Sequence, residues 1–165
     1  MPAGRRGGVL VVSAALLALG LAATARAEGV AILGLDGVDL GRWHGHGDLV
    51  ADDAHCVAVA RGHGPPRFRL EATGDGPGGR FELANGVSRL PVVLRYDDGS
   101  GARRLEPGRV LDGLRGHPDT PGLRRCLRGD HGARNRLEIR VRERDLAAAG
   151  AGEFRGRIFL MVLPE

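Results

Sequence analysis

The sequence predicts a single all-β domain, a sandwich of two sheets, and three observations support this fold class. Along the chain of 165 residues, segments of alternating apolar and charged side chains recur, which is typical of half-buried strands. Short clusters of Gly, Pro and Asp separate these segments, and helical periodicity is almost absent. Many short antiparallel strands joined by turns are typical of two sheets packed face to face.

Residues 1–27 are expected to lie outside this domain, because they have the pattern of a secretory signal peptide. A basic start at Arg5 and Arg6 precedes an apolar stretch, and an A-x-A cleavage pattern ends at Ala27. An uncleaved membrane anchor is the alternative, but the apolar run is short for a membrane span. We expect an exported mature domain of residues 28–165, with no transmembrane segment after signal cleavage.

The charge of the mature domain does not favour a nucleic-acid partner. The full chain has 24 basic and 20 acidic residues, and the signal peptide contains three of the arginines and no acid. A nearly neutral domain lacks the broad positive potential that attracts a polyanion. Arg140, Arg142 and Arg144 alternate with other residues, and we interpret them as the solvated face of a strand.

The strands follow in order from their local patterns. Alternation is clearest in RFRLEAT (67–73) and RLEIRVRER (136–144). The residues expected to face the core are Phe68, Leu70 and Ala72 in the first and Leu137, Ile139 and Val141 in the second. Other strands are predicted at 30–40, 56–60, 80–83, 90–96 and 157–163. The only helix signal, DLAAAGAG (145–152), predicts one or two turns before the last strand.

The last predicted strand is apolar throughout and carries no charge along IFLMVL. Its residues are Ile158, Phe159, Leu160, Met161, Val162 and Leu163. Their side chains would face both ways, which suits a strand buried on both faces. The following Pro164 cannot donate to a ladder and marks the end of pairing. An uncovered apolar edge strand would aggregate, so the sequence predicts that another strand covers this one.

Two cysteines, Cys56 and Cys126, remain after signal cleavage. An exported protein matures in an oxidising compartment, where an even number of cysteines favours a disulfide. We therefore predict that these two residues form a disulfide, with two free buried thiols as the alternative. No CxxC pattern is present, so neither a redox nor a zinc motif is predicted.

A histidine pair in HGHG is the strongest candidate for chemistry. His44 and His46 lie two residues apart, so both imidazoles could reach one metal from an extended strand, and His55 and His63 follow. The neighbouring glycines make this segment mobile, and no third ligand has a fixed spacing. The acids nearby, Asp48, Asp52 and Asp53, are common in any loop. We interpret the segment as a solvated loop with no metal.

No other motif predicts catalysis. The glycine-rich GDGPGG (74–79) lacks the Lys-Ser/Thr of a phosphate loop. Ser88 and Ser100 do not lie in a G-x-S-x-G pattern. Trp43 is better explained as a core or edge-covering residue than as a ligand-stacking one. We expect a protein that is not an enzyme and binds no cofactor, with a structural role.

Taken in order, these segments resemble the spore coat protein U-like family, which includes subunits of chaperone–usher fimbriae. The resemblance rests on LDGVDLGRW, CVAVA, FRLEATGDG, FELANGVSRLPVVLRYDDGSG and LEIRVRERDLAAAGAGEFRGRIFLMVLPE. It covers about residues 35–165. Gly152, Phe154 and Gly156 occupy the family's last motif, whereas Leu40 stands where the family usually has Phe.

The resemblance implies an immunoglobulin-like sandwich of pilin type that lacks its final strand. Such a subunit is covered first by a periplasmic chaperone and then by the extension of a neighbouring fimbrial subunit, at an outer-membrane usher. This is strand addition to an open sheet edge. Ile158–Leu163 would be the edge strand of the acceptor groove. The protein would pass through the periplasm to the cell surface, where it forms part of a fimbria or coat.

Few residues precede the first predicted strand, which departs from subunits that carry a donor extension. This chain would then accept a strand without donating one, as a tip subunit does. Two other function classes stay open. One is a self-complete monomeric exported module that binds a surface carbohydrate or protein. The other is a secreted enzyme or metal protein that uses His44 and His46. Neighbouring chaperone and usher genes would favour the fimbrial subunit, and metal analysis tests the last class.

Overall fold

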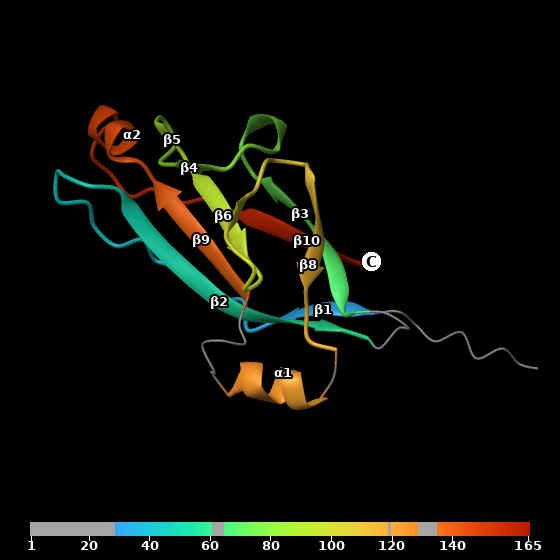
Figure 1. Cartoon of the computed structure of the whole chain (residues 1–165). Coiled ribbons are helices and arrows are strands. Elements are labelled where there is room, and N and C mark those ends of the chain that lie inside the picture. Colours follow the sequence, from blue (N-terminus) through green and yellow to red (C-terminus); the bar gives the residue numbers. More distant parts are fainter. Residues whose placement is uncertain (1–28, 61–64, 119, 129–134) are drawn as a thin grey trace, which may run out of the picture.

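The computed structural model describes residues 29–60, 65–118, 120–128 and 135–165, and it confirms an all-β sandwich. Two antiparallel sheets form its layers, and a small hairpin and two α-helices lie at the ends (Figure 1). The expected signal peptide falls outside the described residues. Within the described part of the chain, no helix is both long and apolar enough to cross a membrane.

The first sheet has five strands in the order β1-β2-β9-β6-β7. Its strands are β1 (Val30–Leu33), β2 (Leu49–Val59), β9 (Asn135–Val141), β6 (Val93–Asp97) and β7 (Arg103–Arg104). Each pairs antiparallel with its neighbours, and β2 lies along β9 from Leu49 opposite Val141 to His55 opposite Asn135. This sheet contains the central strands of the sandwich.

The second sheet has three strands in the order β10-β3-β8. These are β10 (Ile158–Pro164), β3 (Arg67–Gly74) and β8 (Val110–Arg115), and all pairs are antiparallel. The strands β4 (Glu82–Ala84) and β5 (Arg89–Pro91) form a separate hairpin, and a 3-10 turn η1 covers Pro77–Gly79. The second sheet therefore ends at β10 on one side and at β8 on the other.

The core lies between the two sheets. Its largest fully buried apolar side chains come from both layers and are Tyr96, Phe68, Leu70, Leu94, Leu114 and Val57. The rings of Phe68 and Tyr96 meet edge to face, with centroids 6.2 Å apart. The alternation predicted for 67–73 is confirmed, and that for 136–144 is confirmed as far as Val141, because Phe68, Leu70, Ala72, Leu137, Ile139 and Val141 are all buried. The strand ends there and α2 begins at Glu143, so Arg144 lies in a helix and not on the face of a strand as expected.

Several element boundaries differ from the sequence prediction. The strand predicted over 30–40 ends at Leu33, because Gly34 turns the chain with a φ of 73° and Asp36 N then donates to a side chain. The strand predicted over 90–96 is two strands in different sheets, β5 and β6. The strand β2 begins at Leu49, seven residues earlier than predicted. β8 and the short β7 were not predicted.

Two α-helices lie at opposite ends of the sandwich (Figure 1). The helix α2 (Glu143–Ala148) lies close to the predicted 145–152, and Glu143 and Asp145 in its first turn suit the positive end of the helix dipole. The helix α1 (Thr120–Leu127) was not predicted, because the TPG at its start was interpreted as a turn. It packs against β2.

Candidate functional site

Strand β10 has a free edge. It pairs antiparallel with β3 over its whole length, from Ile158 opposite Gly74 to Pro164 opposite Phe68. Among the described residues, no strand pairs with its other side. β1 comes near β10, but its ladder partner is β2 in the other sheet. The N-terminal strand therefore does not complete the second sheet.

The backbone groups of β10 alternate between β3 and the free edge. Arg157 O accepts a hydrogen bond from Asp75 N at 3.2 Å, and Glu165 N donates to Arg67 O at 3.3 Å. The odd-numbered residues therefore direct their N–H and C=O groups to β3, and the even-numbered residues direct theirs to the free edge. The side chains of these even residues, Ile158, Leu160 and Val162, are half-buried against the core.

A groove lies beside the chain segment that precedes β10. It has a volume of about 1160 Å³ and lies between residues 38–43 and 149–156. Its floor is apolar and is formed by Leu49, Leu83, Leu90, Val141 and Leu146, with Val38, Leu40, Trp43 and Phe154 beside them. The charged residues Asp39, Arg42, Glu153 and Arg155 also line it. Apolar lining of a groove next to unpaired backbone is the combination that binds an extended chain.

The wall formed by residues 149–156 is held in place by β4. Ala84 N donates to Arg155 O at 2.8 Å, and Arg155 N donates to Ala84 O at 2.9 Å. Gly156 lies so close to β4 that a Cβ there would be 2.3 Å from the carbonyl oxygen of Glu82. Only glycine fits at this position, which gives the last motif of the resemblance a packing reason.

The opposite wall is fixed by two side-chain hydrogen bonds. Trp43 Nε1 donates to Gly47 O at 2.9 Å, and the indole packs half-buried against the core. Asp36 N donates to Asp53 Oδ2 at 3.1 Å. Trp43 thus covers the edge of the core, in the role expected from the sequence.

The outer face of β10 is open in the single chain. Phe159 is 55% exposed and Met161 is 49% exposed, whereas the side chains between them face the core. The continuous apolar sequence was interpreted as burial on both faces. Among the described residues, only the inner face is covered, because β10 lies at the edge of a two-layer sandwich and no described element packs outside it.

The disulfide between Cys56 and Cys126 is present, as predicted. The two Cα atoms are 5.9 Å apart, and the bridge ties α1 to β2 across 70 positions of sequence. Both cysteines are buried. The bond therefore adds a covalent link to the packing of α1 against the first sheet.

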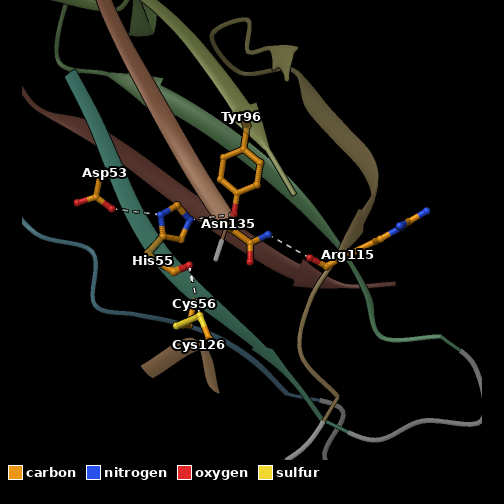
Figure 2. The surroundings of a disulfide bond; sticks show 7 residues. All are labelled: Asp53, His55, Cys56, Tyr96, Arg115, Cys126 and Asn135. Carbon is orange, nitrogen blue, oxygen red and sulfur yellow. Dashed lines mark hydrogen bonds and ion pairs between the residues drawn. A yellow bond between two sulfur atoms is a disulfide. The ribbon is translucent and has the colours of Figure 1, made fainter. Parts of the chain in front are cut away.

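Next to the disulfide lies a buried polar cluster that the sequence did not reveal (Figure 2). His55 is 1% exposed; its Nδ1 lies 3.2 Å from Asp53 Oδ1 and its Nε2 lies 2.9 Å from the hydroxyl of Tyr96. Asn135 Nδ2 donates to Arg115 O at 3.0 Å beside them. The cluster connects β2, β6 and β9 with the end of β8.

Burial determines the protonation of this cluster. It lowers the pKa of His55, although the Asp53 carboxylate opposes this shift. Burial, with help from the Asp98 carboxylate, raises the pKa of Tyr96. The neutral imidazole then donates from Nδ1 to Asp53 and accepts the Tyr96 hydroxyl at Nε2. The arrangement gives His55, Tyr96 and Asn135 hydrogen-bond partners inside the domain.

The other residues considered for chemistry do not come together. His44 and His46 are exposed in the bend before β2, and His63 lies outside the described residues. Within the described ranges, no group of three His, Cys, Asp or Glu side chains could hold a metal ion. Arg140, on the outer face of β9, forms ion pairs with Asp48 and Glu138, both at 3.2 Å.

Neither a family model nor a curated protein matches this chain. Its fold is similar to that of a chain in the solved structure described as "Chaperone-tip adhesin complex is vital for synergistic activation of CFA/I fimbriae biogenesis". The TM-score is 0.54 and the sequence identity 15%, over 82% of this chain and 41% of that chain. This chain thus spans less than half the length of the solved chain, and the similarity is one of fold.

Proposed function

We propose that this chain is an exported subunit of a surface fimbria or coat that accepts a β-strand from another protein. The observation that carries the proposal is the free edge of β10, whose unpaired backbone lies directly above the half-buried Ile158, Leu160 and Val162. A strand added there would form ladder hydrogen bonds and insert every second side chain toward the core. The fold similarity to a chain of a chaperone–adhesin complex supports the proposal.

The groove gives the added strand a path. From the β10 edge it would continue between residues 38–43 and 149–156, over the apolar floor. Its donor in the periplasm would be a chaperone and, after export through an usher, a neighbouring subunit. We propose that this chain accepts a strand at the β10 edge, in the manner of a tip subunit. Its residues 28–165 would act as one pilin-like domain.

Amide hydrogen exchange tests the proposal at single residues. In the dilute monomer, the N–H groups of Ile158, Leu160 and Val162 should exchange fast, because they face the free edge. Those of Phe159, Met161 and Leu163 should exchange slowly, because they donate to β3. Co-purification with a chaperone encoded beside this gene should protect the first set and leave the second set unchanged. Slow exchange of both sets in the monomer would refute the proposal and favour a self-complete binding module.

A charge placed under the added strand gives a second test. Leu160→Asp should abolish complex formation with the chaperone, because the added strand would bury an unpaired carboxylate. Val50→Asp is the matched control, since Val50 is 44% exposed on the opposite sheet. Circular dichroism of both variants separates loss of binding from loss of folding. Equal chaperone binding by a folded Leu160→Asp variant and by wild type would contradict the groove.

A further inference from the structure

The outer face of β10 has a symmetric arrangement of side chains. Exposed apolar residues alternate along it, Phe159 and Met161, followed by the half-buried Leu163. The same row continues to Arg157 on one side and to Glu165 on the other, and both are exposed. In the single chain, Glu165 Oε2 accepts a hydrogen bond from Gly113 N of β8 at 3.0 Å, a contact that pairing with a second copy would exchange. The row therefore reads basic, apolar, apolar, apolar, acidic, and Met161 is at its centre.

The other exposed positions of the two sheets differ from this row. The outer face of β9 carries Arg136, Glu138 and Arg140. The edge strand β7 is only Arg103–Arg104, and the edge strand β8 contains a register shift opposite β3. Short length, charge and irregularity are the devices that keep sheet edges from pairing. The edge strand β1 is also uncharged but has only four residues. β10 has seven residues and no charge, so it is the longest uncharged edge among the described strands.

We infer that two copies of this chain pair through β10 when no other strand occupies its edge. The two strands run antiparallel about a two-fold axis at Met161. Phe159 then lies opposite the partner's Leu163, and Arg157 lies opposite the partner's Glu165. This pairing does not depend on the proposed function. If both hold, the second copy covers the acceptor edge before a donor strand arrives.

The backbone of β10 supports the same register. The backbone N–H and C=O groups of the even-numbered residues point to the free edge, so Leu160 and the partner's Val162 form a hydrogen-bonded pair. The two-fold axis generates the same pair between Val162 and the partner's Leu160. Ile158 N–H donates to the partner's Pro164 oxygen. Pro164 has no N–H to return, which ends the ladder at that point. The half-buried inner rows of the two copies then meet and extend one core into the other.

Charge selects this register from its neighbours. If one strand slides along the other and the even-numbered residues stay hydrogen-bonded, each residue faces a partner residue two positions away from its earlier one. Such a shift places Arg157 opposite the partner's Leu163, or Glu165 opposite the partner's Phe159. Only pairing about Met161 brings opposite charges together at both ends. Opposite charges stabilise directly facing positions on antiparallel strands, and like charges destabilise them.

Charge reversal tests the pairing in solution. Sedimentation of the mature domain should show a concentration-dependent doubling of mass. Arg157→Glu and Glu165→Arg should each shift the protein to monomer, because like charges then face each other at both ends. The double variant, with both charges reversed, should recover the dimer. Arg136→Glu, on the outer face of β9, is the matched control and should leave the dimer unchanged.

A cysteine on the axis tests the register. Facing residues of a non-hydrogen-bonded pair have Cα atoms about 4.5 Å apart, within the range of about 4.4–6.8 Å for a disulfide. Met161→Cys should therefore cross-link two copies under oxidising conditions. Phe159→Cys should not cross-link, because position 159 faces the partner's Leu163, four positions away from the partner's own cysteine.

The outcomes separate this inference from the proposed function. A domain that is monomeric at all concentrations, a dimer that tolerates both single charge reversals, or a Met161→Cys variant that does not cross-link would each overturn the inference. None of these results affects the exchange measured with a chaperone. Conversely, a dimer with the expected charge and cysteine behaviour would stand even if no chaperone protected the β10 edge.

Discussion

The disulfide between Cys56 and Cys126 should carry a large share of the stability of this domain. The bridge closes a loop across 70 positions. In the chain-entropy account, closure of a loop of that length lowers the entropy of the unfolded chain enough to stabilise the fold by about 4 kcal/mol. A typical domain is stable by only about 5–15 kcal/mol. Loss of the bridge should therefore leave the domain marginally folded.

Urea unfolding measures this contribution. The wild-type domain, oxidised and reduced, should be compared with a Cys56→Ala/Cys126→Ala variant. With a denaturant slope of about 1–3 kcal/mol per molar, the unfolding midpoint should fall by roughly 2 M on reduction. The double variant should fall at least as far, because both cysteines are buried and truncation removes packing as well.

Two results would refute this reasoning. If the unreduced native protein contained two thiols that can be alkylated after unfolding, the bridge would not form. If reduction lowered the midpoint by only a few tenths of a molar, the unfolded chain would already be compact around this loop. Agreement between reduction and the double variant would show that loop closure, rather than the packing of the sulfur atoms, is the main contribution.

Three further predictions concern single sites. Burial lowers the pKa of His55 from its usual 6.5, so below that pH the unfolded chain binds a proton that the folded domain excludes. The free energy of unfolding should therefore fall as the pH falls through 6.5. Urea midpoints of His55→Asn should lack this pH-dependent loss. Gly156→Ala should lower the free energy of unfolding by about 1–3 kcal/mol, because its Cβ would meet Glu82 O, and Gly150→Ala, with 3.9 Å to its nearest atom, should not. The variant His44→Ala/His46→Ala should have the melting temperature of wild type, since both side chains are exposed. Mass spectrometry should find no bound metal in either protein.

The parts of the fold that the sequence predicts are those determined by local pattern. The strands β3 and β9 have strict alternation, so their buried faces could be assigned without a structure. Strand β2 was predicted to begin seven residues too late, because Asp52 and Asp53 interrupt its apolar pattern. Asp53 belongs in the strand because it is 8% exposed and hydrogen-bonded inside the domain. Its partners are distant in sequence, so local pattern could not show this.

The same distinction applies to the candidate site. Cys56 and Cys126 could be paired by counting, and the apolar strand at 158–163 was evident from composition. The groove could not be predicted, because its walls at 38–43 and 149–156 meet only in the folded chain. The polar cluster also depends on tertiary contacts, since His55 and Tyr96 are 41 positions apart. Helix α1 was missed because its start, Thr120-Pro121-Gly122, has the composition of a turn.

The continuous apolar sequence of β10 forms two rows of side chains in the structure, one on each face of the strand. The inner row, with Leu160 at its centre, packs against the core and lies below unpaired backbone, so it needs a strand. The outer row, with Met161 at its centre, is exposed to solvent, and an apolar partner surface would bury it. A strand added at the edge, from a donor or from a second copy, covers the inner row and places its own outward side chains beside the outer row. A donor with apolar side chains on both faces of its strand would therefore match both rows. A donor with polar outward side chains would match only the inner row.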